Sequence, residues 1–255
     1  IRKYIFIILV SALVLFLLFF SALSFSQVET HNNNFWLHYV GKNKIAKNTF
    51  FTLEATMRYT DGINQKQQWF IRPSLDYQFN NNLVGSVGYT HYNTYSYGDF
   101  PINKIDTPED HIWIQGTYTH TSGNFKFIHR LRDENRFVGI AAKNSSTGNY
   151  EIDRYEYRNR VRYMFLVNYT LTKNDDKAKL FAVLGDEAFV NIGSNAGKTF
   201  FNQNRIIGGL GYNINKNHQV QLNYIQQHIW NFSNTIQEDN PTIRVSYITN
   251  FDFTK

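Results

Sequence analysis

The final segment of the chain, residues 242–253, alternates between apolar and polar side chains. Its apolar residues are Ile243, Val245, Tyr247, Phe251 and Phe253, and the intervening positions are mostly polar. Successive side chains of a strand point to opposite faces, so this pattern predicts a strand whose two faces meet different solvents. The same alternation recurs along nearly the whole chain, and it therefore predicts an all-β protein built from two-faced strands.

Eleven segments of this kind are predicted, at 33–41, 48–60, 66–79, 83–96, 110–121, 125–138, 153–170, 178–191, 200–213, 218–231 and 242–253. Several exceed the roughly 9–11 residues with which a tilted strand crosses a bilayer. Short polar connections, at 80–82, 122–124, 173–177 and 215–217, alternate with longer ones at 97–109, 139–152, 192–199 and 232–241. Short periplasmic turns and longer extracellular loops are typical of an antiparallel up-and-down transmembrane β-barrel.

The strand number follows from parity. Bacterial single-chain barrels normally have an even number of strands, so we expect twelve, with ten as the alternative. Either a short strand precedes residue 33 or two segments have been merged. Whether residues 27–34 enter the barrel lumen stays open.

The N-terminal segment has the character of a secretory signal peptide over residues 1–26. Arg2 and Lys3 precede an apolar run from Tyr4 to Phe20, and small residues at Ser24 and Ser26 precede Gln27. An uncleaved membrane anchor is the competing interpretation, because the run approaches the length that spans a bilayer. The small-residue site favours cleavage, which leaves residues 27–255 as one barrel domain.

The composition excludes several classes of protein. The sequence contains no Cys. The net charge of +6 is spread along the chain and does not cluster in one patch, which argues against nucleic-acid binding. No long apolar run follows residue 26, so a helical membrane protein is excluded. Mean hydropathy is −0.42, but a barrel hides its lipid face in alternation.

Charged residues gather on one face of two neighbouring strands. Charge on a lipid face costs about 2–4 kcal/mol at the bilayer midplane, so this face must point into the lumen. The expected lumenal basic cluster is Arg130, Arg132, Arg136, Arg154, Arg158, Arg160 and Arg162. The expected carboxylate partners are Glu54, Asp76, Glu134, Glu156 and Glu187. Such ladders are usually structural ion pairs, but Arg forks also suit an anion-attracting eyelet.

Three segments carry a family resemblance. They are Phe35-Trp36-Leu37, the stretch 51–59 with Glu54 and Arg58, and Arg205 followed by Gly208-Gly209-Leu210-Gly211-Tyr212. Together they resemble the Bacteroidetes outer-membrane barrels grouped as domain of unknown function 2490. The resemblance implies an outer-membrane location and no established activity. The last strand also resembles the sorting signal of outer-membrane barrels, with Tyr247, Phe251 and Phe253 as the signal residues.

The sequence contains no convincing catalytic or metal-binding motif. His228 and Ser233 are five residues apart, which places them on opposite faces of a regular strand, so a lipid hydrolase is disfavoured. The histidines are scattered, and Asp106, Glu109 and Asp110 are assigned to a solvated loop, so no metal or other cofactor is expected.

The sequence therefore predicts a structural or accessory outer-membrane barrel, or a narrow anion-preferring channel. The alternative is a subunit that binds a partner through its extracellular loops. Expected partners are outer-membrane lipid and lipopolysaccharide, the barrel-assembly machinery and another outer-membrane protein, with no nucleic acid.

Overall fold

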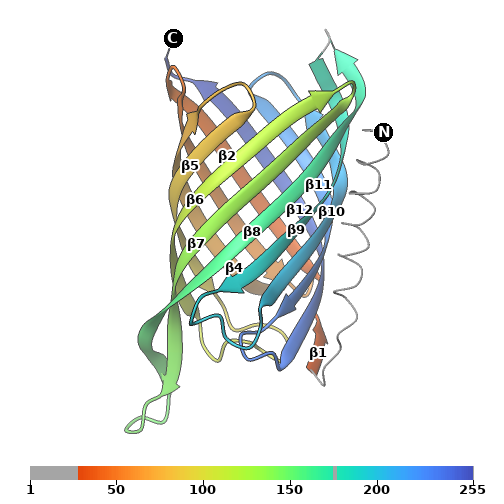
Figure 1. Ribbon diagram of the computed structural model, residues 1–255. Coiled ribbons are helices and arrows are strands. Elements are labelled where there is room, and N and C mark those ends of the chain that lie inside the picture. Colours follow the sequence, from red (N-terminus) through yellow and green to blue (C-terminus); the bar gives the residue numbers. More distant parts are fainter. Residues whose placement is uncertain (1–27, 175–176, 255) are drawn as a thin grey trace, which may run out of the picture.

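The computed structural model describes residues 28–174 and 177–254, and over these residues the chain forms one twelve-stranded sheet closed on itself (Figure 1). The strands are β1 (Val28–His31), β2 (Asn34–Ala46), β3 (Thr49–Thr60), β4 (Gln65–Gln78), β5 (Leu83–Thr94), β6 (Thr107–Ser122), β7 (Phe125–Lys143), β8 (Tyr150–Asn174), β9 (Lys177–Ile192), β10 (Phe201–Asn213), β11 (His218–Trp230) and β12 (Ile236–Asp252). No helix within the described residues is long and apolar enough to cross a membrane. The expected signal peptide, 1–26, lies outside these residues and stays a prediction.

The barrel closes through eleven strands rather than twelve. Each strand from β2 to β12 pairs antiparallel with its neighbour in sequence, and β12 then pairs in parallel with β2 from Asn34↔Thr242 to Lys44↔Asp252. The remaining strand, β1, is not part of this closed set of eleven and pairs in parallel with the start of β12, at residues 236–239. The expectation of twelve strands is confirmed, and the additional one does precede residue 33. The expectation that an even number of strands closes the barrel is wrong. Eleven strands close it, because β1 and β2 pair one after the other with the same edge of β12.

The segment left open by the sequence, residues 28–34, lies at the end of the barrel that carries the longer loops. Asn32 donates from Nδ2 to Asn240 Oδ1 at 3.0 Å, and Thr30, Asn32 and Asn34 are all buried. An odd number of closed strands puts the start of β2 and the C-terminal end of β12 at opposite ends of the barrel (Figure 1).

Asparagine side chains shape the tight turns. Asn80 Oδ1 accepts hydrogen bonds from the backbone amides of Asn82 and Leu83, both at 2.9 Å. Asn215 Oδ1 does the same for Asn217 and His218. Such side-chain mimicry of a backbone turn is why Asn-rich connections between apolar runs become tight turns.

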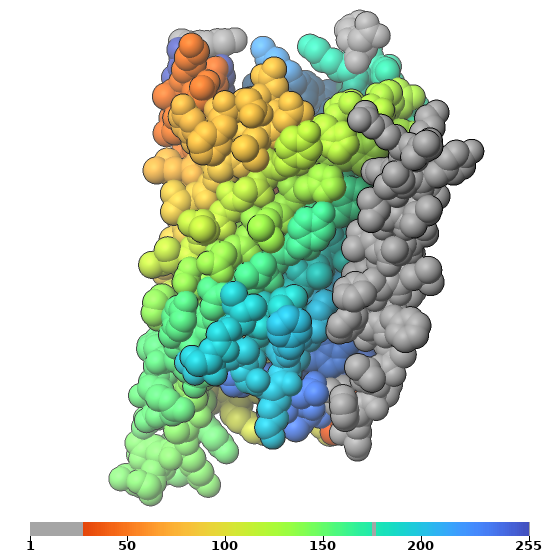
Figure 2. All heavy atoms as spheres, in the orientation of Figure 1, coloured from red at the N-terminus to blue at the C-terminus, as the bar shows by residue number. Residues whose placement is uncertain are grey.

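Two of the expected loops are largely strand. Most of 139–152 belongs to β7 and β8, whose pairing continues past an irregularity at Ile140/Ala141 to Lys143↔Tyr150. Residues 236–241 belong to β12. Polar and glycine residues in these segments suggested loops, but backbone pairing with an adjacent strand decides the outcome. The β7–β8 hairpin consequently protrudes beyond the barrel rim (Figure 2).

The two faces of the wall follow the alternation. Outward apolar side chains are well exposed, as in Ile114 (60%), Leu131 (56%) and Leu184 (64%). The buried side chains inside are largely polar or charged, including Arg132, Glu134 and Glu187. An apolar exterior around a polar interior is the arrangement of a transmembrane barrel.

The eleven-stranded closure is testable with engineered cysteines, because the chain has none. Leu37 and Val245 are paired across β2 and β12, and adjacent strands lie about 5 Å apart, within reach of a disulfide. We expect Leu37→Cys with Val245→Cys to cross-link on oxidation, as seen by gel mobility after denaturation.

The matched control is Leu37→Cys with Leu222→Cys, since Leu222 pairs with Val245 from the far side of β12. This pair should stay reduced. Cross-linking of the control, or none in the first pair, would contradict the direct pairing of β2 with β12.

Candidate functional site in the barrel lumen

The interior of the barrel encloses a cavity of about 300 Å³. Eight arginines and three glutamates are among its lining residues. The arginines are Arg58, Arg72, Arg130, Arg136, Arg160, Arg162, Arg205 and Arg244, and the glutamates are Glu54, Glu109 and Glu187. This imbalance in favour of positive charge makes the cavity the candidate site.

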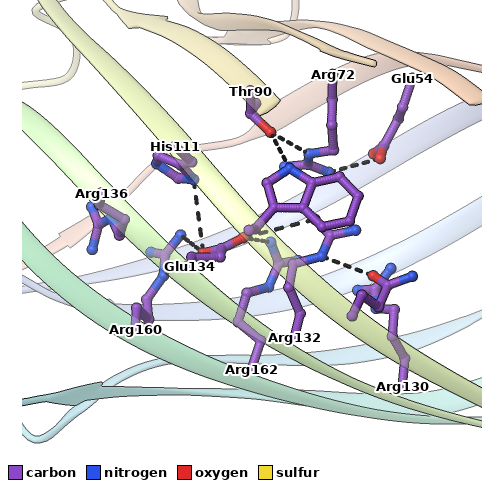
Figure 3. A network of polar contacts seen from close by, with 12 residues as sticks. Glu54, Arg72, Thr90, His111, Arg130, Arg132, Glu134, Arg136, Arg160 and Arg162 are labelled. Atoms are coloured by element: carbon purple, nitrogen blue, oxygen red, sulfur yellow. Dashed lines mark hydrogen bonds and ion pairs between the residues drawn. The ribbon is translucent and has the colours of Figure 1, made fainter. Parts of the chain in front are cut away.

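Glu134 on β7 lies at the centre of the ion-pair network (Figure 3). It is fully buried, and its two oxygens accept from Arg160 at 2.7 Å and Arg162 at 2.6 Å. Arg132 lies 3.7 Å away, and His111 Nδ1 lies 4.0 Å away. A buried carboxylate with several guanidinium donors is held ionised, since charge-assisted bonds offset its desolvation.

Glu187 on β9 forms the second junction of the network. Its Oε1 accepts from Arg162 Nη2 at 2.6 Å and from Arg130 Nη2 at 2.5 Å. Arg205 Nη1 lies 3.5 Å from the other oxygen. Arg162 therefore bridges Glu134 and Glu187, and the network ties the neighbouring strands β7, β8, β9 and β10 together along one wall of the lumen.

Two smaller ion-pair clusters line other parts of the lumen, one between β6 and β7 and the other on β2, β3 and β4. Glu109 accepts from Arg136 Nε at 2.5 Å, and it also pairs with His111. Glu54 accepts from Arg72 Nη1 at 2.7 Å and lies 3.2 Å from His38. These pairs neutralise Arg72 and Arg136 locally.

Three cavity arginines have mainly amide partners. Arg58 donates to Gln68 Oε1 at 2.6 Å, Arg205 to Gln227 Oε1 at 2.8 Å, and Arg244 to Asn223 Oδ1 at 3.1 Å. The Nε atoms of Arg58 and Arg244 are buried without a hydrogen-bond acceptor in the described part of the chain. Among the described residues, Arg58 and Arg244 form no ion pair with a carboxylate, and Arg205 shares Glu187 with Arg130 and Arg162.

An apolar patch interrupts the polar lining. Trp36, Ile207 and Ile225 are buried together, and Leu166 packs against them. Trp36, Leu166 and Ile207 also line the cavity, as does Phe189, which is 1% exposed. The lumen thus combines guanidinium groups with an apolar surface.

The connection between β5 and β6 folds over the loop end of the lumen. Tyr97 lines the cavity and donates from its hydroxyl to Glu238 Oε2 on β12 at 2.9 Å. Gly98 N donates to Gln65 Oε1 at 3.2 Å. These bonds join the connection to β12 and to β4.

Most of the expected basic cluster meets in the lumen. Arg130, Arg136, Arg160 and Arg162 line the cavity, and Arg132 is buried beside Glu134. Arg158 lies farther toward the loop end, where it contacts Glu156 at 2.9 Å and the ring of Phe232. Arg154 is in the protruding hairpin, 59% exposed, and pairs with Asp153 and Glu156.

The expected carboxylates lie in different parts of the barrel. Glu54, Glu134 and Glu187 belong to the network, whereas Glu156 pairs with Arg158 near the rim. Asp76 is buried but hydrogen-bonds to Thr52 and Ser74, and no described arginine forms an ion pair with it. Arg154 and Glu156 depart from the cavity because β8 continues past the rim.

Sequence reasoning missed several lumenal residues. Glu109 and His111 lie on β6, whereas the sequence predicts a loop at Glu109 and no lumenal role for His111. The alternation of Thr107, Glu109, His111 and Trp113, all now inward, was the available signal. Pro108 and the acidic residues around it masked that signal. Nothing local in the sequence indicates that Tyr97 meets Glu238.

The expected sorting-signal residues, and the His228 and Ser233 pair considered for a hydrolase, lie on the outer face or at the rim of the barrel. Tyr247 is 41% exposed and Phe253 is 68% exposed, and the rings of Phe251 and Phe253 are 6.2 Å apart. His228 pairs with Asp239, and Ser233 is hydrogen-bonded to Thr235 and Asn231. Within the described residues no group of three or more His, Cys, Asp or Glu could hold a metal ion.

The network makes a stability prediction. Glu134→Gln removes the charge that compensates Arg160 and Arg162, and breaking a buried pair in this way costs about 3–5 kcal/mol. We expect the free energy of unfolding in detergent and urea to fall by that order. Glu156→Gln, near the rim, is the control and should cost about 1 kcal/mol or less. Equal losses would contradict a central role for Glu134.

Comparisons with known proteins give a family and one similar solved structure. No curated protein matches the chain. A solved structure described as "NanC porin structure in rhombohedral crystal form" is similar over 81% of this chain and 93% of that chain, with 8% identity and a TM-score of 0.42. Residues 33–238 match the family described as "Protein of unknown function (DUF2490)". The chain belongs to this family of unknown function.

Proposed function

We propose that the protein is an integral outer-membrane barrel whose lumen forms a narrow, anion-preferring passage. The observation that carries this proposal is the excess of arginine over glutamate around the cavity. A confined site lined by one sign of charge concentrates ions of the opposite sign. Rings of Arg or Lys select anions in known pores.

The membrane assignment is supported by the outer face of the wall. Large apolar side chains remain exposed on every second position of the strands, as at Ile112, Ile114 and Leu222. Burying such a surface in lipid removes its cost in water. The end with tight turns is then periplasmic, and the end with the β7–β8 hairpin faces outward.

The network itself also stabilises the barrel, and the two roles coexist. Arg160 and Arg162 are held by Glu134 and Glu187 and form the rigid wall. Arg58, Arg205 and Arg244 retain charge for a passing anion. No hydrolytic step belongs to the proposal.

Arg244→Gln tests anion preference, because its only hydrogen-bond partner in the described chain is an amide and no carboxylate is orphaned by the change. A unit charge about 4 Å from an ion is worth about 1 kcal/mol in water. We therefore expect the anion-to-cation permeability ratio to fall about two- to fivefold, measured from reversal potentials in a planar bilayer with a KCl gradient.

Arg154→Gln is the matched control, since Arg154 is exposed on the hairpin beyond the rim. Its reversal potential should equal that of the unaltered protein. Cation preference in the unaltered protein, or no current at all, would overturn the proposed passage.

A second candidate function rests on the protruding β7–β8 hairpin. Its strands extend past the barrel to Lys143 and Tyr150, and Tyr150 and Tyr155 are 46% and 54% exposed. Exposed aromatic side chains are favoured anchors of protein interfaces. We propose this hairpin as the docking element if the barrel works within an outer-membrane complex.

Shortening the hairpin tests this second function. Replacing residues 142–151 by a two-residue turn should remove a stoichiometric partner from a mild-detergent pull-down while the barrel stays folded. Tyr163→Phe, on the outward wall of the same strand, is the control. Retention of the partner by the shortened protein would exclude the hairpin as the docking element.

A further inference from the structure

Trp36 lies between the charged and the apolar parts of the lumen. Its indole Nε1–H donates to Gln67 Oε1 at 3.1 Å, which fixes the ring in the cavity wall. The guanidinium carbon of Arg58 lies 4.0 Å from the ring centroid, and that of Arg205 lies 5.2 Å from it. Two cations from opposite parts of the sequence therefore share one aromatic ring.

These two cations lack a carboxylate of their own. Arg58 has only Gln68 as a hydrogen-bonded partner among the described side chains. The carboxylate nearest to Arg205 is Glu187, whose Oε2 lies 3.5 Å from Arg205 Nη1 and whose Oε1 accepts shorter bonds from Arg130 and Arg162. Three guanidinium groups therefore share the single negative charge of Glu187. Cation–π contacts and amides offset part of the desolvation of a buried guanidinium, but they leave its charge in place.

A bound anion would complete this arrangement. Arg58 and Arg205 both line the cavity, and a guanidinium presents its donors in a fork that matches a carboxylate. Arg58 and Arg205 lie near the same ring and repel each other, and an anion close to both guanidinium groups would offset that repulsion. The site is therefore electrostatically suited to one negatively charged group.

The apolar patch beside the two arginines indicates what kind of molecule carries the negatively charged group. Ile207 and Leu166 pack with Trp36, and both line the cavity. Contact with an apolar wall adds no binding free energy for an inorganic anion. A hydrocarbon group buried there contributes about 25 cal/mol of binding free energy per Å² of apolar surface removed from water. The volume of about 300 Å³ lies at the lower end of ligand cavities, so the body must be small.

We propose that the lumen binds a small carboxylate with a compact apolar body, the carboxylate held by Arg58 and Arg205 and the body packed against Trp36, Leu166 and Ile207. This inference rests on the proposed anion passage and names the chemical class of its solute. The site is separate from the Glu134 junction, whose arginines are occupied by glutamate.

Three probes test the site on the unaltered mature protein in detergent by isothermal titration calorimetry. Phenylacetate carries both the charge and the ring, acetate carries only the charge, and phenylacetamide carries only the ring. We expect phenylacetate to bind at least about tenfold more tightly than either of the others. Equal affinity for phenylacetate and acetate, or for phenylacetate and phenylacetamide, would overturn the proposal.

Variants then locate the binding. Arg58→Gln and Arg205→Gln should each weaken phenylacetate about tenfold or more, while Ile207→Thr should weaken phenylacetate and leave acetate unchanged. Arg154→Gln is the control, and the heat-dependent gel shift of a folded barrel checks each variant. Undiminished binding by both folded arginine variants would reject the site.

The passage and the binding site can fail separately. Anion-selective current without phenylacetate binding would keep the passage and overturn the site. Phenylacetate binding that is lost in Arg58→Gln, in a barrel that passes no current, would keep the site and overturn the passage.

Discussion

Pairing between β2 and β12 is the interaction on which the rest of this structure depends. It closes the sheet, so that backbone groups on both edges find partners along Asn34–Lys44 and Thr242–Asp252. In a bilayer, an unpaired backbone group costs several kcal/mol, and only a closed wall avoids that cost. Because the closing pair is parallel, the first barrel strand starts at the loop end, and β1 extends there along β12.

Closure also fixes the character of the interior. A barrel of this size fills its lumen with side chains, and alternation sends polar residues inward once the apolar ones face outward. The buried charges must then pair with one another, and Glu134 and Glu187 each hold two or more arginines. The same arginine network that stabilises the wall sets the electrostatic potential of the lumen.

The excess of cations is local rather than general. Glu109, Glu134 and Glu187 lie on β6, β7 and β9 and Glu54 lies on β3, and these four hold arginines in ion pairs, whereas Arg58, Arg205 and Arg244 are held chiefly by amides. Amides orient a guanidinium without neutralising it, so the charge remains available to an anion. A stabilising network and a binding surface therefore adjoin in one cavity, and the apolar patch at Trp36 distinguishes the second from the first.

The sequence by itself determined the strands, their two faces and the tight turns, because period-two alternation and Asn-rich connections act locally. It also indicated that Arg160 and Arg162 point inward. Only the tertiary structure decided the parity of closure, the length of β8 and which arginines lack a carboxylate. These depend on pairing between segments distant in sequence, and one local pattern fits several such pairings. Trp36 meeting Arg205 is such a contact: no spacing predicts it, because the barrel must close before the two side chains meet.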